Sequence, residues 1–277
     1  MGRLDNKVAF ITGAAHGQGR AHAVRMAQEG ADIIAVDLCA PLDNVYYEMG
    51  TEEELAETVR LVEAEDRRIM ASQADVRDFD ALKSAVDTGV AEFGRLDFIV
   101  ANAGISNIGP ALEITEKDWD AVVDIDLKGV FLTIKAAAPH IIEHGEGGSI
   151  VITSSAAGLH AFAGLAHYAS AKHGCVGLMR VLAVEFGPEK IRVNSIHPTQ
   201  VNTPMLMNAY SFGLFCPDVE NPTVDDFAPV SQAMHTLPTP WVEAVDIANA
   251  AVFLCSDEAR FITGVPLPVD AGADLIA

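Results

Sequence analysis

The sequence predicts an α/β fold in which helices flank a doubly wound parallel sheet. Short apolar stretches rich in β-branched residues alternate with segments of helical periodicity along the chain. This alternation is typical of parallel strands joined by crossover helices. The first apolar stretch leads directly into a glycine-rich turn, as in a Rossmann-type unit. No repeat, low-complexity tract or linker divides the 277 residues, so we expect a single domain over residues 1–277.

Composition narrows the class of protein. Half of the residues are apolar, and 39 acidic against 18 basic residues give a net charge of −21. Nucleic acids and anionic membranes attract basic surfaces, so we expect neither as a partner. Four scattered cysteines and nine histidines without ligand spacing predict neither a disulfide framework nor a metal site. Because no apolar stretch resembles a signal peptide or a membrane span, a cytoplasmic protein is expected.

The glycine-rich turn follows an expected strand at residues 8–11 and precedes a helix that closes at Gly30. Glycines let backbone N–H groups approach a pyrophosphate at the N-terminus of a helix, where the helix dipole favours an anion. Only the backbone of the histidine in this turn is needed for that contact. We therefore expect the turn to bind a dinucleotide through Gly13, Ala15, His16, Gly17, Gln18 and Gly19.

The second expected strand, residues 32–36, ends at Asp37. A carboxylate at this place accepts hydrogen bonds from the adenosine ribose and repels a 2′-phosphate, so NAD is favoured over NADP. An ordinary turn residue at the end of a strand is the alternative. We place Asp37 and the neighbouring Leu38 among the cofactor-binding residues.

An insert at about residues 38–50 has neither helical nor strand periodicity. Connections in such units usually span about 2–6 residues. Because the insert begins beside Asp37, we expect Val45, Tyr46 and Tyr47 to cover the adenine end of the cofactor. Such a cover mainly slows ligand release. A surface loop without a role is the alternative.

The next elements continue the alternation of helices and strands. Thr51 and Glu54 form a capping box at the start of a helix. The strand at residues 69–71 leads to Asp75 and Val76, which we expect to meet the adenine. A helix over about 79–93 precedes a strand at 98–101, and after that strand come the expected cofactor-binding residues Asn102, Ala103 and Gly104.

Residues 115–144 have helical periodicity, and Pro139 is expected to kink or end the regular part. The C-terminal part of the chain has a strand at 191–196, a helix at about 243–254 and a strand at 265–269. Between them, residues of about 200–240 mix apolar side chains with prolines, which predicts a mobile substrate lid.

A pair of residues with acid–base potential, Tyr168 and Lys172, lies one helical turn apart. A lysine beside a phenol favours the phenolate, so we expect the tyrosine to exchange a proton nearer neutral pH. Ser155 follows an apolar stretch, at the end of a strand where α/β sheets bind ligands. A packed aromatic ring and a solvated lysine are the alternative. His167, next to the tyrosine, is expected to face solvent, and a place in the lining of the substrate site is the alternative.

Reversal of the strand order after the first strand would gather the ends of several strands in one crevice. The side chains and turns expected there are Gly13, Asp37, Asn102, Ser155 and Thr203.

Taken together, these motifs resemble those of the short-chain dehydrogenase/reductase family over the full length of the chain. The matching features are Thr12-Gly13-x3-Gly17-x-Gly19, Asp75-Val76, Asn102-Ala103-Gly104, Ser155, Tyr168-x3-Lys172 and Pro198 with Thr203-Pro204. The insert, residues 57–63 and residues 266–272 resemble more narrowly the mycofactocin-coupled branch, the carveol-dehydrogenase-like proteins.

The resemblance implies roles for several residues. Tyr168 would be the general base that takes the alcohol proton, Lys172 would bind the nicotinamide ribose and lower the pKa of the tyrosine, and Ser155 would orient the substrate oxygen. Val201 and Thr203 would hold the carboxamide. The family carries an asparagine in a proton relay where this chain has Asp126, which we count among the catalytic candidates.

The resemblance also implies an activity: NAD-dependent interconversion of a small apolar, terpenoid-like secondary alcohol and its ketone. Members of the narrower branch hold NAD without releasing it and pass electrons to a second redox carrier, and the family leads us to expect a homotetramer. Two alternatives stay open. One is a carbonyl or 3-oxoacyl-thioester reductase that uses free NAD(P)H. The other is a non-catalytic NAD-sensing or scaffold protein, which would be expected to lack Tyr168 or Lys172.

Overall fold

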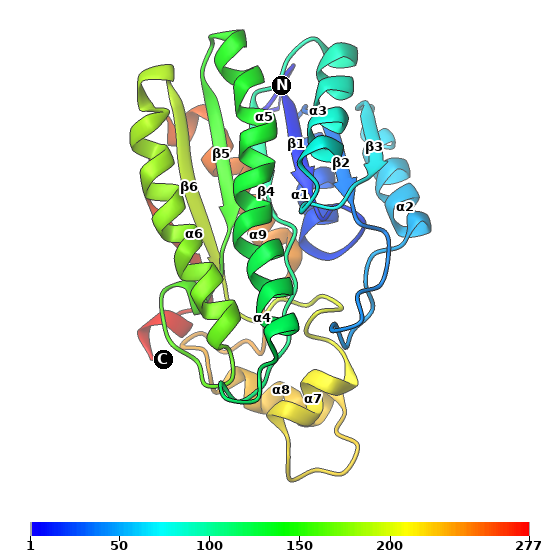
Figure 1. Cartoon of the computed structure of the whole chain (residues 1–277), viewed down its shortest axis with the longest axis vertical. Helices are drawn as coiled ribbons and strands as arrows, with labels where there is room; N and C mark the ends of the chain where they lie inside the picture. Colours follow the sequence, from blue (N-terminus) through cyan, green and yellow to red (C-terminus); the bar gives the residue numbers. More distant parts are fainter. Residues whose placement is uncertain (1, 277) are drawn as a thin grey trace.

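The strands described in residues 2–276 of the computed structural model pair into one parallel sheet (Figure 1). Its order is β3-β2-β1-β4-β5-β6-β7, so the strand order reverses after β1 as predicted. The strands are β1 (Val8–Thr12), β2 (Asp32–Asp37), β3 (Ile69–Gln73), β4 (Phe98–Ala101), β5 (Gly148–Thr153), β6 (Ile191–Pro198) and β7 (Pro266–Val269). Ligands of open α/β sheets bind where the order reverses, at the carboxyl ends of the strands.

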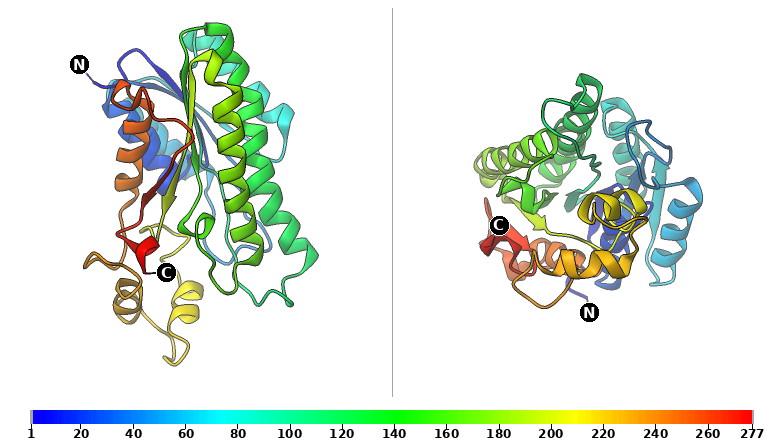
Figure 2. Two further views of the ribbon diagram at one scale, coloured as in Figure 1. Left: turned by 90° about the vertical axis from the view of Figure 1, so that its left-hand side faces the viewer. Right: turned by 90° about the horizontal axis from the view of Figure 1, so that it is seen from below.

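Helices cover both faces of this sheet (Figure 2). One apolar core lies between the sheet and α1 (Gly17–Gln28), α2 (Glu52–Glu63) and α9 (Ala244–Cys255). The other lies between the sheet and α3 (Phe79–Phe93), α4 (Glu116–Val123), α5 (Val130–His144) and α6 (Ala166–Glu185). Neighbouring strand residues divide between the two cores, as Ala9 and Phe10 do, because successive side chains of a strand point to opposite faces.

The insert and the predicted lid both lie at the carboxyl ends of the strands (Figure 1). The insert is irregular, as expected, and leads into the capping box of Thr51 and Glu54 at the start of α2. The lid contains two short helices, α7 (Ala209–Phe215) and α8 (Val224–Gln232).

Residues 115–144 do not form one regular helix. Between α4 and α5 lies a π-helical turn, η1 (Asp124–Gly129). Pro139 is inside α5, which continues to His144, so of the two predicted effects, a kink or the end of the regular part, the second does not occur. The proline removes one backbone donor, but α5 stays packed on the sheet through the buried Ala136, Ala137, Ala138 and Ile141.

No helix within residues 2–276 is both long and apolar enough to cross a membrane.

Candidate active site

The glycine-rich turn brings the backbone of β1 close to the turn after β4. Gly13 has a φ of +71°, and a Cβ atom there would lie 3.0 Å from the Cα of Ala103. At Gly19 a Cβ atom would lie 1.8 Å from the Gly13 carbonyl oxygen, so a side chain is excluded. The N-cap of α1, His16, makes no capping hydrogen bond through its side chain, and the first turn holds no acidic residue. The N–H groups of this turn are therefore open to an anion.

A crevice at the carboxyl ends of the strands contains most of the predicted cofactor-binding residues. Those lining it are Gly13, His16, Gly17, Gln18, Gly19, Asp37, Leu38, Asp75, Val76, Asn102, Ala103, Gly104 and Thr203. Ser155, which we expected in the same crevice, is not in its lining. The insert contributes Leu42, Tyr47, Met49 and Gly50 to the wall. Of the three residues expected to cover the adenine end, Val45, Tyr46 and Tyr47, only Tyr47 is in the lining.

Asp37 fastens the end of β2 to the glycine-rich turn. Its Oδ2 atom accepts the backbone N–H of Ala15 at 2.9 Å, and its Oδ1 atom accepts that of Cys39 at 3.0 Å. A carboxylate oxygen has two lone pairs, so each oxygen can still accept a bond from a ligand in the crevice. This is the placement that the sequence predicted for a ribose-binding acid.

The other predicted cofactor residues occupy separate places around the crevice. Asn102 joins two strands, since its Nδ2 atom donates to the Thr12 carbonyl at 3.0 Å and its Oδ1 atom accepts from Thr153 at 3.2 Å. Thr203 also lines the crevice, with its hydroxyl 3.4 Å from the carbonyl oxygen of the buried Val201.

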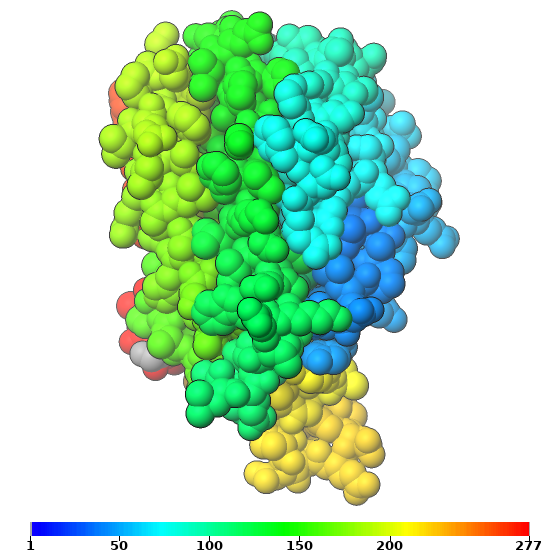
Figure 3. Space-filling model, in the orientation of Figure 1, coloured from blue at the N-terminus to red at the C-terminus, as the bar shows by residue number. Residues whose placement is uncertain are grey.

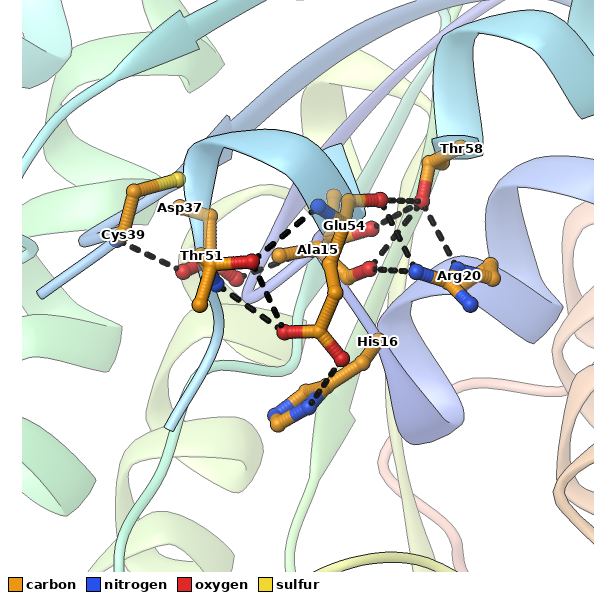
Figure 4. A network of polar contacts seen from close by, with 9 residues as sticks. Ala15, His16, Arg20, Asp37, Cys39, Thr51, Glu54 and Thr58 are labelled. Carbon is orange, nitrogen blue, oxygen red and sulfur yellow. Dashed lines mark hydrogen bonds and ion pairs between the residues drawn. The ribbon is translucent and has the colours of Figure 1, made fainter. Parts of the chain in front are cut away.

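A polar network joins α2 to the glycine-rich turn (Figure 4). The Arg20 guanidinium donates to the Thr58 hydroxyl at 3.0 Å and to the Glu54 carbonyl at 2.8 Å. The Glu54 carboxylate accepts the Thr51 N–H at 3.0 Å and lies 3.6 Å from Nδ1 of His16. The C-terminal end of the insert is thus fixed beside the expected phosphate site.

Tyr168 and Lys172 lie on α6, on the side that faces the sheet. The Nζ atom of Lys172 is 5.4 Å from the centre of the tyrosine ring and donates to the Thr153 carbonyl at 3.2 Å. Ser155, at the end of β5, accepts the N–H of Ala157 at 3.1 Å. The structure therefore brings the three predicted residues of the acid–base group together.

The pKa of the Tyr168 phenol is raised above its ordinary value, chiefly because the ring is buried. The charge of Lys172 lowers this pKa, as expected, and so does a hydrogen bond with Ser155, whereas the charge of Asp126 raises it. The expected downward effect of the lysine is present, but burial and Asp126 outweigh it in the protein alone.

Asp126 reaches this group from η1. It is fully buried, its Oδ1 atom accepts the Ile105 N–H at 2.8 Å, and its Oδ2 atom lies 3.1 Å from Nζ of Lys172. Burial raises the pKa of Asp126, and the lysine opposes this effect. Burial alone would lower the pKa of Lys172, but the charges of Asp126 and Tyr168 raise it above its ordinary value. The lysine therefore stays charged.

Two buried histidines, His197 and His167, form hydrogen bonds with the backbone of Ser155 and Tyr168, and the sequence predicted neither contact. Nδ1 of His197 lies 2.7 Å from the Ser155 carbonyl oxygen and Nε2 lies 2.8 Å from the Ser195 hydroxyl. Because a carbonyl only accepts, the proton is on Nδ1 and the serine donates to Nε2. Burial lowers the pKa of His197 to about 4. The available signal for this contact was the position of His197 in a buried strand.

His167 does not face solvent, so that prediction is wrong. Its side chain is fully buried, Nδ1 accepts the Tyr168 N–H at 2.9 Å, and Nε2 contacts Oδ1 of Asn107. The reason is that α6 begins at Ala166, so His167 lies in the first turn of the helix.

The tyrosines of the insert meet the opposite wall of the crevice rather than the adenine end alone. The hydroxyl of Tyr47 accepts the Ser106 N–H at 3.1 Å. The ring of Tyr46 lies 4.9 Å from that of Tyr210 on α7, centre to centre. Tyr210 in turn donates to the Ile108 carbonyl at 2.9 Å. The insert and the lid therefore lie against each other, as Figure 3 shows where blue meets yellow.

One group with metal-ligand geometry lies away from the crevice, although the sequence predicted none. A ring nitrogen of His144 and carboxylate oxygens of Asp97 and Glu146 lie within 4.8 Å of one another. Lys7 and Arg95 form ion pairs with both acids. The cluster is thus already balanced by cations.

Comparison with known proteins gives full-length matches. A family model described as enoyl-(acyl carrier protein) reductase matches residues 13–274. A putative short-chain type dehydrogenase/reductase of Mycolicibacterium smegmatis is 58% identical over 276 residues, 99% of each chain. The (-)-trans-carveol dehydrogenase of Rhodococcus erythropolis is 51% identical over 99% of this chain and 100% of its own. The crystal structure of carveol dehydrogenase from Mycobacterium avium in complex with NAD has a TM-score of 0.98 and 59% identity, and the match covers 100% of both chains.

Proposed function

The chain belongs to the short-chain dehydrogenase/reductase family, and on this basis we propose that it interconverts an apolar, carveol- or terpenoid-like secondary alcohol and its ketone with NAD. Its likeness to two carveol dehydrogenases supports this substrate class. The single observation that carries the chemistry is the convergence of Tyr168, Lys172 and Ser155 beside a crevice lined by the glycine-rich turn.

The residues of the crevice fit NAD. The uncapped N-terminus of α1 suits a pyrophosphate, and the free lone pairs of Asp37 suit the two ribose hydroxyls of an adenosine without a 2′-phosphate. We assign the adenine to Asp75 and Val76, which line the crevice, and the carboxamide to Val201 and Thr203, of which Thr203 lines it. When bound, NAD supplies the site that accepts hydride from the alcohol carbon.

The protein's own groups handle the proton. Tyr168 removes the hydroxyl proton of the alcohol, and Ser155 donates a hydrogen bond that holds the substrate oxygen. Lys172 stabilises the phenolate by its charge. Asp126 keeps the lysine protonated and partly offsets that charge, because it lies 3.1 Å from Nζ. It accepts hydrogen bonds from a relay water where an asparagine would also donate one.

A retained cofactor is the second part of the proposal. The contacts of Tyr47 with Ser106 and of Tyr46 with Tyr210 close the crevice on the side of the insert. Slow release prevents exchange of NAD after each turnover. Reduced cofactor is then reoxidised in place by a second redox carrier, of the mycofactocin type in the branch that this sequence resembles.

Denaturation of the purified protein tests whether NAD is retained, and an alcohol assay tests the activity. We expect close to one NAD per chain in the supernatant, and turnover of carveol and related alicyclic alcohols with an artificial electron acceptor but little stimulation by added NAD. Protein that purifies empty and turns over steadily with free NAD would contradict retention. Absence of turnover with every alcohol under both conditions would contradict the activity.

A reductase of acyl thioesters is the second candidate, because the matching family model is described as enoyl-(acyl carrier protein) reductase. Such an enzyme would prefer thioester substrates and a free reduced cofactor. Parallel assays with a 3-oxoacyl thioester, an enoyl thioester and carvone, each with NADH and NADPH, separate the candidates. Preference for NADPH would also contradict the role assigned to Asp37.

Assembly as a homotetramer is the last part of the proposal. Large apolar side chains are exposed on the outer faces of α5 and α6, namely Phe131, Ile142, Val181 and Val184. Contact with a second copy would remove them from water. Light scattering on the eluted peak of a size-exclusion column measures the mass. A monomer at micromolar concentration would contradict the proposal.

A further inference from the structure

A continuous path of hydrogen bonds joins the insert to the start of α6. The backbone N–H of Tyr168 donates to Nδ1 of His167 at 2.9 Å. Nε2 of His167 contacts Oδ1 of Asn107, and Nδ2 of Asn107 donates to the carbonyl of Asn44 at 3.1 Å. Asn44, Asn107 and His167 are all buried. The path therefore runs from Tyr168 to the middle of the insert through three buried residues.

The chemistry of the partners fixes every proton on this path. The Asn44 carbonyl only accepts, so the amide nitrogen of Asn107 faces it and the amide oxygen faces His167. That oxygen also only accepts, so the proton of His167 is on Nε2. Nδ1 then carries the lone pair that accepts the Tyr168 N–H. All donors point toward the insert, and a doubly protonated His167 would lose its acceptor for Tyr168.

The start of α6 depends on this acceptor. The first N–H groups of a helix lack partners within the helix, and the N-cap residue, Leu165, offers no side-chain hydrogen bond. His167 accepts the N–H of Tyr168 from within the first turn, so it holds the backbone from which the phenol projects. Misplacement of a reacting group by about 1 Å can reduce a rate by about 10²-fold.

We propose that His167 and Asn107 are positioning residues that couple the insert to the catalytic tyrosine. The inference rests on the proposed function, because it takes Tyr168 as the acid–base group. It adds a role for the insert at the reacting end of the site: Asn44 anchors Asn107, Asn107 orients His167, and His167 sets the position of Tyr168.

Two substitutions of His167 each remove one of its two hydrogen bonds, the one with Asn107 or the one with the Tyr168 N–H. In His167→Asn, the amide oxygen takes the place of Nδ1 and can accept the Tyr168 N–H, while the bond to Asn107 is lost. In His167→Gln, the amide nitrogen takes the place of Nε2 and can donate to Asn107, while the acceptor for Tyr168 is lost. We expect kcat to fall about 10-fold or more in His167→Gln, with KM and NAD content unchanged, and to fall less in His167→Asn.

Asn107→Asp tests the coupling to the insert. The carboxylate still accepts from His167 but cannot donate to the Asn44 carbonyl. We expect a lower kcat and faster amide exchange in two separate segments, residues 42–47 and residues 166–170. His22→Asn is the matched control, since His22 is also fully buried but neither ring nitrogen has a hydrogen-bond partner among residues 2–276. It is expected to lower the melting temperature without changing kcat per bound NAD.

Wild-type kcat in His167→Gln would overturn the positioning role. So would equal losses in both His167 variants that follow their melting temperatures, because a purely structural role predicts that outcome. Wild-type kcat and exchange in Asn107→Asp would overturn the coupling to the insert. If the wild type turns over no alcohol, the proposed function fails, but amide exchange in Asn107→Asp still decides whether the two segments are coupled.

Discussion

The Nζ atom of Lys172 lies 3.1 Å from the Oδ2 atom of Asp126, and both side chains are buried. The charge of Lys172 thus acts on both the Asp126 carboxylate and the phenol of Tyr168. The negative charge of Asp126 raises the pKa of the tyrosine, whereas the positive charge of the lysine lowers it. The proton affinity of the tyrosine is consequently set by its burial together with the charges of Lys172 and Asp126 and the hydrogen bond with Ser155.

Replacement Asp126→Asn is expected to shift the alkaline side of the pH–rate profile to lower pH. The reason is that loss of the carboxylate removes one cause of the raised pKa of Tyr168. The profile of kcat for alcohol oxidation measures this shift. Asp124→Asn is the control, because Asp124 lies two residues away in the same π-helical turn, is only partly buried and pairs with Lys128. Identical profiles for Asp126→Asn and wild type would show that the carboxylate does not influence the tyrosine.

Tyr168→Phe is expected to retain NAD and lose turnover by about 10²–10⁴-fold, the usual contribution of general acid–base catalysis. Phenylalanine keeps the ring and removes the hydroxyl that exchanges the proton. Single-turnover absorbance of the reduced nicotinamide measures the rate, and denaturation measures the bound NAD. Near-wild-type turnover would remove Tyr168 from the mechanism.

Asp37→Ala is expected to weaken NAD binding and narrow the preference for NAD over NADP, since the residue proposed to exclude a 2′-phosphate is lost. The structure adds that Ala15 and Cys39 lose their common acceptor. Asp37→Asn separates these effects, because the amide oxygen can still accept one of the two bonds. Titration of cofactor-free protein with each dinucleotide measures the preference. An unchanged ratio in both variants would place recognition of the adenosine elsewhere.

Stability should fall as the pH decreases from about 6.5 to about 4. Burial lowers the pKa of both His22 and His197 to about 4. The unfolded chain therefore binds more protons than the folded protein in this range, and each histidine destabilises the fold by about 3 kcal/mol at the lower end. Urea unfolding at several pH values measures the slope. His22→Leu is expected to reduce it, and the exposed His173→Leu serves as the control. Equal slopes in all three proteins would contradict the assignment.

Local patterns in the sequence predict the backbone of this protein well. The helix over 79–93 and the strand over 98–101 have the predicted bounds, and the capping box at Thr51 is present. These features depend on neighbours in the sequence. The contacts of His167 and His197 do not, because their partners are the Asn107 side chain, 60 positions away, and the Ser155 backbone carbonyl, 42 positions away. For the same reason the contact of Tyr47 with Ser106 could not be read from an insert without periodicity.

Tyr47→Phe is expected to release NAD faster than the wild type. The hydroxyl of Tyr47 accepts the N–H of Ser106 across the crevice, and its loss leaves this partly buried N–H without its partner and the insert without that anchor. A neutral hydrogen bond of this kind contributes about 0.5–1.5 kcal/mol, which corresponds to roughly a 2- to 13-fold faster release. Tyr46→Phe is the matched control, because its hydroxyl makes no hydrogen bond within residues 2–276 while its ring keeps the contact with Tyr210. Dissociation of NADH into excess NAD, followed by fluorescence, measures the rate. Equal rates for the two variants and the wild type would show that the insert does not retain the cofactor through this contact.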